Sequence, residues 1–248
     1  MKILAVQPEA GDRNVVESLQ KSAFRKMKKA ETIVSLGTTA LGLNPVTADV
    51  KLIIVTLRKL SAMKRQELLN RLDSHLKGNA KRRERDRIAA ARLLVACLPD
   101  SMSVIQRWIA TNSGRWSYEI HFSLFCFLGD AQLLGLDRNL IQALIRSVSE
   151  YLLSMPRNRA KAVWMAGDLL GDHWKGREAL TALLDIARNA HYVAGRSAAI
   201  HGLERRFRRS DQRDPALILR ALRDTVSRDR SRKLRQRVSR VVKRLAVQ

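Results

Sequence analysis

The chain has 248 residues, of which 46% are apolar and 28% are charged, and its formal net charge at pH 7 is +24. This length is enough for one large domain or for about six or seven stacked helix pairs. The chain contains only 5 prolines and 12 glycines, so there is little room for long disordered tracts. No stretch approaches the length of a membrane span. The apolar run at the start of the chain, within Met1 to Pro8, is too short for a signal peptide. We therefore expect a soluble, cytoplasmic protein that does not bind a membrane.

The positive charge comes mainly from arginine, with 33 arginines against 14 lysines. Such an excess repels itself in a compact fold, so a polyanion is the expected partner. The alternative is that a basic proteome, or GC-rich coding that favours arginine over lysine, explains the same excess without any polyanionic partner.

The first third of the chain predicts divergent helices. We expect residues 1–12 to form a flexible tail and residues 13–80 to form an N-terminal helical segment. Within it, one helix is predicted from Asn14 to about Gly37, with a turn at Asn44–Pro45. Thr47 is the expected N-cap of the next helix, and a further helix is predicted over about Met63–Leu76.

A basic run opens the second segment, which we predict over residues 81–248. It contains Lys81, Arg82, Arg83 and Arg85 and leads into an apolar helix. Charge runs are usually solvated faces, but this one lies at a junction between helices, where it could also contact a phosphate backbone. Cys97 lies in the apolar helix that follows and Cys126 in a later one. Both are predicted to be small buried residues rather than a disulfide or metal ligands.

One pattern recurs along this segment at intervals of 34 to 39 residues. A polar residue, usually arginine, is followed by apolar or small residues at the fourth, fifth, seventh and eighth positions of a frame in which it is the first. The first positions are Arg87, His121, Arg159, Arg196 and Arg235. A second set of amphipathic stripes, such as Leu180, Leu183, Leu184 and Ala187, lies between these helices. Each unit is therefore predicted to be a pair of antiparallel helices, and the repetition predicts an all-α solenoid.

This pattern resembles the HEAT-repeat family, in the short form similar to the repeats of phycobilisome lyases. The resemblance rests on the arginine that opens the second helix and on a following Gly-Asp, as in Gly129–Asp130 and Gly171–Asp172. It covers about residues 85–248 and implies a HEAT-like α-solenoid, a superhelix of antiparallel helix pairs. The resemblance gives almost no information about function, because one fold can carry many functions.

The arginines at the first frame position are expected to be structural. Asp185 precedes Arg196 by 11 residues, and Asp224 precedes Arg235 by the same interval. We predict that each aspartate pairs with the arginine of the next helix. The better candidates for ligand contact are therefore the other cations nearby.

The end of the chain is strongly basic and is predicted to form a cationic cap. Residues 204–244 contain 16 Lys or Arg and 5 acidic residues. Val238, Val241, Val242 and Leu245 form the apolar stripe of the last helix, whose other side is almost wholly cationic. The candidate nucleic-acid-binding residues here are Arg205, Arg208, Arg209, Arg232, Lys233, Arg237, Arg240, Lys243 and Arg244.

Aromatic residues cluster over residues 116–127, with Trp116 and Tyr118 at the expected helix start. Core filling explains such a cluster best. A stacking platform for bases is the alternative.

Signals of catalysis are weak. No glycine-rich phosphate loop, paired Cys-x-x-Cys or His-Glu-x-x-His is present. We therefore predict no catalytic residue, no metal site and no cofactor. The sequence favours a binding protein over an enzyme. Trp164, Asp168, Asp172 and Trp174 lie near one helix, which is reminiscent of the HEAT-like alkylpurine DNA glycosylases. Their motif does not align here residue by residue.

Three functions follow in order of preference. The first is non-catalytic binding of DNA or RNA through the phosphate backbone. The second is a scaffold or adaptor for an acidic protein, since curved repeat surfaces serve as extended binding faces. The third is the glycosylase activity.

Overall fold

The computed structural model of the chain describes residues 32–77, 84–110, 114–130, 135–154, 160–174, 176–208 and 215–246. These residues form helices and connecting turns without a strand, which confirms the predicted all-α class. The helices are α2 (Ile33–Leu41), α3 (Val50–Lys59), α4 (Ala62–Lys77), α5 (Glu84–Ala96), α6 (Met102–Ala110), α7 (Gly114–Asp130), α8 (Arg138–Ser154), α9 (Ala160–Asp168), the π-helix η2 (Leu169–His173), α10 (Arg177–Asn189), α11 (Val193–Phe207), α12 (Pro215–Arg228) and α13 (Arg232–Leu245). None of the helices in these ranges is long and apolar enough to cross a membrane.

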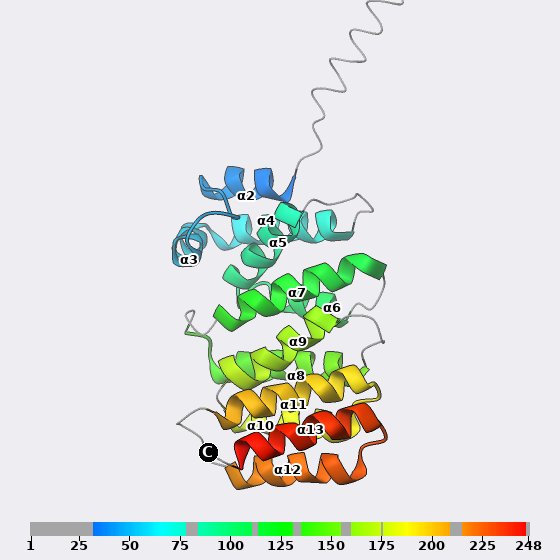
Figure 1. Cartoon of the computed structure of the whole chain (residues 1–248). Coiled ribbons are helices and arrows are strands. Elements are labelled where there is room, and N and C mark those ends of the chain that lie inside the picture. The colour runs from blue at the N-terminus through cyan, green and yellow to red at the C-terminus, as the bar shows by residue number, and fades with distance from the viewer. Residues whose placement is uncertain are drawn as a thin grey trace, which may run out of the picture.

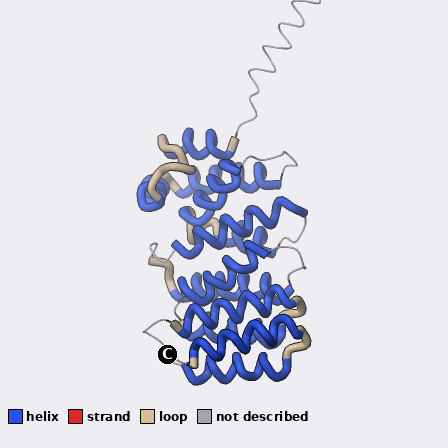
Figure 2. The backbone as a smooth tube through the Cα atoms, in the orientation of Figure 1, coloured by secondary structure: helices blue, strands red, loops and turns tan. Residues whose placement is uncertain are grey.

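The helices are stacked along one axis in the order of the chain, from α2 at one end to α12 and α13 at the other (Figure 1). They form two rows. In the first row α5 packs on α7, α7 on α9, α9 on α11 and α11 on α13, and in the second α6 packs on α8, α8 on α10 and α10 on α12. Figure 2 shows the same arrangement, with the helices in blue and the described turns in tan. Each element therefore buries its apolar side against neighbours that are close in sequence.

The repeat frame read from the sequence matches the burial of the first row. The five residues at its fourth position are each 0% exposed: Ala90, Leu124, Ala162, Ala199 and Val238. Each contributes to the apolar core that runs through the stack, because residues at the same helical position point to the same side of successive helices.

Two N-terminal predictions need correction. The helix expected from Asn14 to Gly37 is interrupted at Thr32, which has extended backbone angles and caps α2 through a reciprocal bond with Ser35. Residues 1–31, including the expected tail, lie outside the described residues. Asp49 rather than Thr47 caps α3, with its Oδ1 accepting from the Lys51 amide at 2.7 Å.

A buried arginine holds the connection between α2 and α3. Arg92 lies in α5 and is 9% exposed. Its guanidinium donates to the backbone carbonyl of Pro45 at 2.9 Å and also to those of Val46 and Ala48. Because a buried charge is costly unless it is fully hydrogen-bonded, this side chain fixes the path of the turn against α5.

Neither cysteine forms a disulfide within the described residues. Cys97 is buried, and this burial raises the pKa of its thiol to about 12. Cys126 is only half-buried.

Arginines at the first frame position close the turn that precedes their own helix. Arg196 donates from Nη1 to the carbonyls of Ala190 and His191 at 2.8 and 3.1 Å, and Arg235 donates to the carbonyl of Asp229. Arg196 also binds the Asp229 carboxylate through Nε and Nη2 at 2.6 and 3.2 Å. The α10–α11 turn is thereby joined to the α12–α13 turn.

The structural role predicted for these arginines is therefore correct, but the predicted acidic partners are wrong. Asp185 instead accepts from Asn189 at 2.6 Å, and Asp224 lies 4.0 Å from Arg188. The physical reason is that helical side chains tilt toward the N-terminus of their helix. An arginine in the first turn then reaches the connection behind it rather than the middle of the preceding helix.

Glycines allow α9 and η2 to approach α11 closely. A Cβ added at Gly171 would lie 2.4 Å from the Gly202 carbonyl oxygen, and one at Gly167 would lie 2.5 Å from the Ala198 carbonyl oxygen. The same stretch leaves the α-helical hydrogen-bond pattern at Leu169, and the Trp174 amide closes the π-helix by donating to the Leu169 carbonyl at 3.1 Å. Asp168 and Asp172 thus lie on either side of a local change in helical geometry.

We predict that Arg196→Met lowers the free energy of unfolding by about 3–5 kcal/mol, because it leaves the Asp229 carboxylate buried without its counter-charge. Urea denaturation measures this loss. Arg188→Met is the matched control, since the Arg188–Asp224 pair is exposed and at 4.0 Å, and we expect a change within about 0.5 kcal/mol. Equal effects of the two substitutions would contradict the role of Arg196.

We further predict that Gly171→Ala costs about 1–3 kcal/mol, because the new methyl group meets backbone atoms that cannot move aside. Gly176→Ala is the control. Its Cβ would come within 3 Å only of the Glu178 Oε2 atom, at 2.7 Å, which is the end of a flexible side chain. Thermal unfolding followed by circular dichroism compares the two, and an equally small effect at Gly171 would argue against the close helix approach.

Candidate functional site

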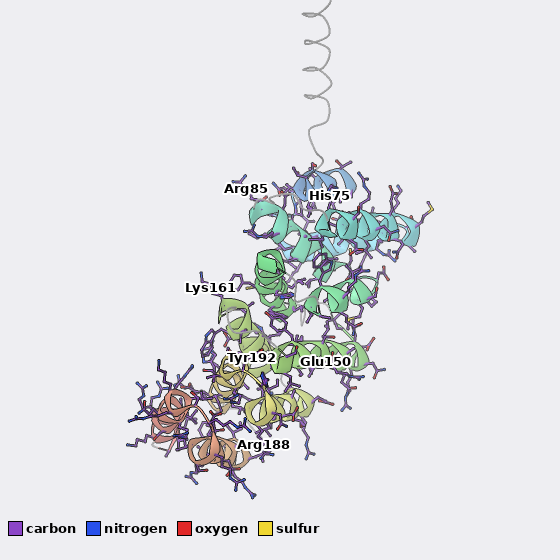
Figure 3. The ribbon with its side chains drawn as sticks, turned by 90° about the vertical axis from the view of Figure 1, so that its right-hand side faces the viewer. His75, Arg85, Glu150, Lys161, Arg188 and Tyr192 are labelled. Atoms are coloured by element: carbon purple, nitrogen blue, oxygen red, sulfur yellow. The ribbon has the colours of Figure 1, made fainter. Side chains whose placement is uncertain are left out.

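The exposed sides of three neighbouring helices form one charged surface, which we name the α9–α11–α13 face. Its residues are Lys161, Trp164 and Asp168 of α9, Asp172 of η2, Ser197, His201, Glu204, Arg205 and Arg208 of α11, and Lys233, Arg237, Arg240, Lys243 and Arg244 of α13. Figure 3 shows Lys161 on the left side of the stack, which is the side of the first row, and Glu150 of α8 on the opposite side. The helices thus present different side chains on their two sides.

Helical periodicity explains why these residues share a side. In α11 the residues Arg196, Ala199, Ile200 and Leu203 are buried, so the other flank carries residues at intervals of three and four. In α13 the buried stripe is Leu234, Val238, Val241 and Leu245. One flank beside this stripe then carries Lys233, Arg237, Arg240 and Arg244, at positions i, i+4, i+7 and i+11.

An aromatic ring lies at the centre of the face. The half-buried Trp164 ring contacts the His201 ring edge-on, with centroids 4.8 Å apart. The guanidinium of Arg237 lies over the same indole, 4.4 Å from its centroid. Arg237 also donates to the Ser197 hydroxyl at 2.8 Å. One tryptophan therefore brings together α9, α11 and α13.

Burial lowers the pKa of the Arg237 guanidinium. Glu204 acts in the opposite direction, while Arg244 and Arg240 lower this pKa further. An arginine side chain stays protonated in proteins. The lowered pKa therefore indicates that the positive charge of Arg237 is partly desolvated and is repelled by Arg244 and Arg240. A bound anion would offset the repulsion, because an opposite charge favours the charged form of the guanidinium.

Three carboxylates compensate part of the charge. Asp172 pairs with Arg205 at 2.7 Å, and Asp168 lies 2.8 Å from the His201 Nε2 atom and 3.8 Å from Arg205. Glu204 is nearly buried and accepts from Arg208 at 2.7 Å and from Arg244 at 2.9 Å. Each of the three acids thus contacts at least one arginine from the next helix of the first row.

Several cations of the face remain without such compensation. Within the described part of the chain, no carboxylate lies within 4 Å of Lys161, Lys233, Arg240 or Lys243, and all four are exposed. An open depression is lined by Arg237, Arg240, Lys243 and Arg244. A depression lined by four cations is chemically suited to an anion with several negative charges.

The predicted site residues divide into four groups. Lys81, Arg82, Arg83 and Arg209 lie outside the described residues. Arg85 is exposed at the start of α5, on the same side as Lys161 in Figure 3. Arg205, Arg208 and Arg244 are engaged by carboxylates, and Arg237 by Trp164 and Ser197. Arg232, Lys233, Arg240 and Lys243 are exposed, and so is Arg244, whereas Arg237 is half-buried.

Sequence reasoning missed the contacts at Trp164, although a signal for one of them was present. Trp164 and His201 both occupy the sixth position of the repeat frame, and equivalent positions lie on the same side of successive helices. The frame gives no signal for the second contact, because Arg237 occupies the third position.

The four residues weighed for a glycosylase do not form one accessible set. Trp174 is 4% exposed, and its carbonyl accepts from Arg206 at 3.1 Å. Asp168 and Asp172 are engaged by His201 and Arg205. The described residues also contain no group of three or more His, Cys, Asp or Glu that could hold a metal ion.

The aromatic cluster of residues 116–127 is described only in part. Phe125 is 1% exposed and packs edge-on against Tyr151 with centroids 5.0 Å apart, which fits core filling. The side chains of Trp116 and Tyr118 lie outside what is described.

Comparison with known proteins adds no relative to this description, since no family model, no curated protein and no solved structure matches the chain.

Proposed function

We propose that this chain is a HEAT-like solenoid that binds nucleic acid without catalysis, and that it contacts the phosphate backbone through the α9–α11–α13 face. The stacking of helix pairs in chain order supports the solenoid, because within the described residues each pair packs mainly on the pairs next to it. The observation that carries the binding proposal is the set of uncompensated cations beside the Arg237–Trp164 pair.

A polyanion is the ligand that this charge arrangement favours. Like charges on one helix flank destabilise each other by a few tenths of a kcal/mol per pair. Phosphates would neutralise Arg237, Arg240 and Arg244 and release the counterions condensed on the nucleic acid. The resulting affinity depends on charge and is largely independent of base sequence.

We predict that Arg240→Glu together with Lys243→Glu weakens binding to an oligonucleotide and leaves the fold intact, because both side chains are exposed and neither packs in the core. Fluorescence anisotropy at several salt concentrations gives the dissociation constant and its salt dependence. The wild type is expected to lose about three to five decades of affinity between about 50 and 200 mM salt if it binds about six to ten phosphates. The slope falls by about one unit for every phosphate that the variant no longer binds.

The matched control is Arg146→Glu with Arg220→Glu, which makes the same change in net charge on α8 and α12 of the second row. We expect this control to retain most of the affinity. Equal loss in the two double variants would mean that net charge rather than this face determines binding. No binding by the wild type at low salt would instead leave the acidic-protein scaffold as the better function.

We also predict that Glu204→Gln tightens binding by about fivefold, equivalent to about 1 kcal/mol. The substitution removes the carboxylate that holds Arg208 and Arg244 at 2.7 and 2.9 Å, and both guanidiniums become available to phosphate. Glu204→Asp, which keeps the charge, is the control and should not tighten binding. An affinity of Glu204→Gln at or below that of the wild type would show that Glu204 does not compete with the ligand.

A further inference from the structure

Trp164 and the arginine that covers it lie at the centre of the α9–α11–α13 face. Arg237 covers the indole at 4.4 Å, yet no carboxylate lies within 4 Å of it in the described chain. Its polar contact here is the neutral Ser197 hydroxyl at 2.8 Å. By contrast, Arg244 on the same flank is held by Glu204 at 2.9 Å. An incoming phosphate can therefore draw Arg237 away more readily than Arg244, because a phosphate offers the guanidinium a counter-charge and a bidentate pair of hydrogen bonds, which the serine hydroxyl does not.

Moving Arg237 to a phosphate would expose one side of the Trp164 ring. A planar guanidinium now lies over that ring, and a nucleobase is a planar group that stacks on tryptophan in the same way. His201 supports the ring from a neighbouring helix, with centroids 4.8 Å apart. The exchange gives the phosphate a charged partner and gives the base an aromatic one.

The cations on α13 form a row that can follow a phosphate backbone. Lys233, Arg237, Arg240 and Arg244 lie along one flank, with rises of about 6, 4.5 and 6 Å between successive residues at about 1.5 Å per residue. Several phosphates of one strand can therefore each meet a cation, while the base preference depends on Trp164.

From these observations, and resting on the proposed function, we infer that the α9–α11–α13 face binds single-stranded nucleic acid, with phosphates along α13 and one base stacked on Trp164 in the place of Arg237. Paired bases inside a duplex already stack on each other and cannot reach the indole. The face therefore selects single strands or unpaired loops over duplex.

The test uses the full chain and three probes with equal numbers of phosphates: a thymidine oligomer, an abasic oligomer and a duplex. We expect the thymidine oligomer to bind more tightly than the other two in anisotropy titrations. Trp164→Leu should weaken binding of the thymidine oligomer by about 5- to 150-fold, the range that corresponds to the loss of one base–aromatic stack. Its affinity for the abasic oligomer and its salt slope should not change, because the variant still binds the same phosphates.

Two further variants serve as controls. Trp164→Phe keeps an aromatic ring and should retain part of the preference for the thymidine oligomer. Tyr192→Leu removes a half-buried aromatic side chain at the α10–α11 turn, outside the face, and should retain all of it. If Trp164→Leu fails to fold, the comparison of thymidine and abasic oligomers on the wild type still decides the question.

The outcomes separate base stacking from phosphate binding. Equal affinity of the wild type for all three probes would overturn the stacking inference and leave the phosphate-binding function in place. Absence of binding to every probe at low salt would overturn both.

Discussion

The arrangement of the C-terminal helices depends on one buried ion pair, Arg196 with Asp229. The arginine side chain is 11% exposed and the carboxylate 5%, and the two are joined by bidentate contacts at 2.6 and 3.2 Å. Arg196 simultaneously satisfies two carbonyls of its own turn, and the Asp229 carboxylate accepts the Ser231 amide at 2.7 Å. Breaking such a pair costs far more than its formation contributes. The pair therefore specifies how one helix hairpin is placed on the next.

The candidate site follows from this placement. Because the pair links the turn before α11 to the turn before α13, it sets the register in which the two helices lie side by side. That register brings Arg237 to Ser197 at 2.8 Å and to the Trp164 ring, and it brings Arg244 to Glu204 at 2.9 Å. The close glycine contact between η2 and α11 fixes the third helix in the same way. The relative positions of the three helices, and with them the face, are thus set by contacts at the turns and at the glycines.

Much of the core was predictable from the sequence, because burial follows a fixed helical frame that places Ala199 and Val238 at equivalent positions. The partner of Arg196 was not predictable in the same way, since it depends on the path of a turn rather than on helical spacing. The π-helix at Leu169–His173 was missed because a pattern with a period of 3.6 residues cannot indicate a change of period. The cation–π contact of Arg237 with Trp164 was missed because it joins non-adjacent helices of the first row.

Protection of lysines from acetylation, measured by mass spectrometry with and without a single-stranded oligonucleotide, tests the central claim that the α9–α11–α13 face contacts nucleic acid. Lys161, Lys233 and Lys243 belong to the face, whereas Lys59 and Lys64 are also exposed but lie at the other end of the stack. We expect the oligonucleotide to protect the first three lysines and to leave the other two fully reactive. Protection of Lys59 and Lys64, or no protection of Lys161, Lys233 and Lys243 at a saturating concentration, would contradict this claim.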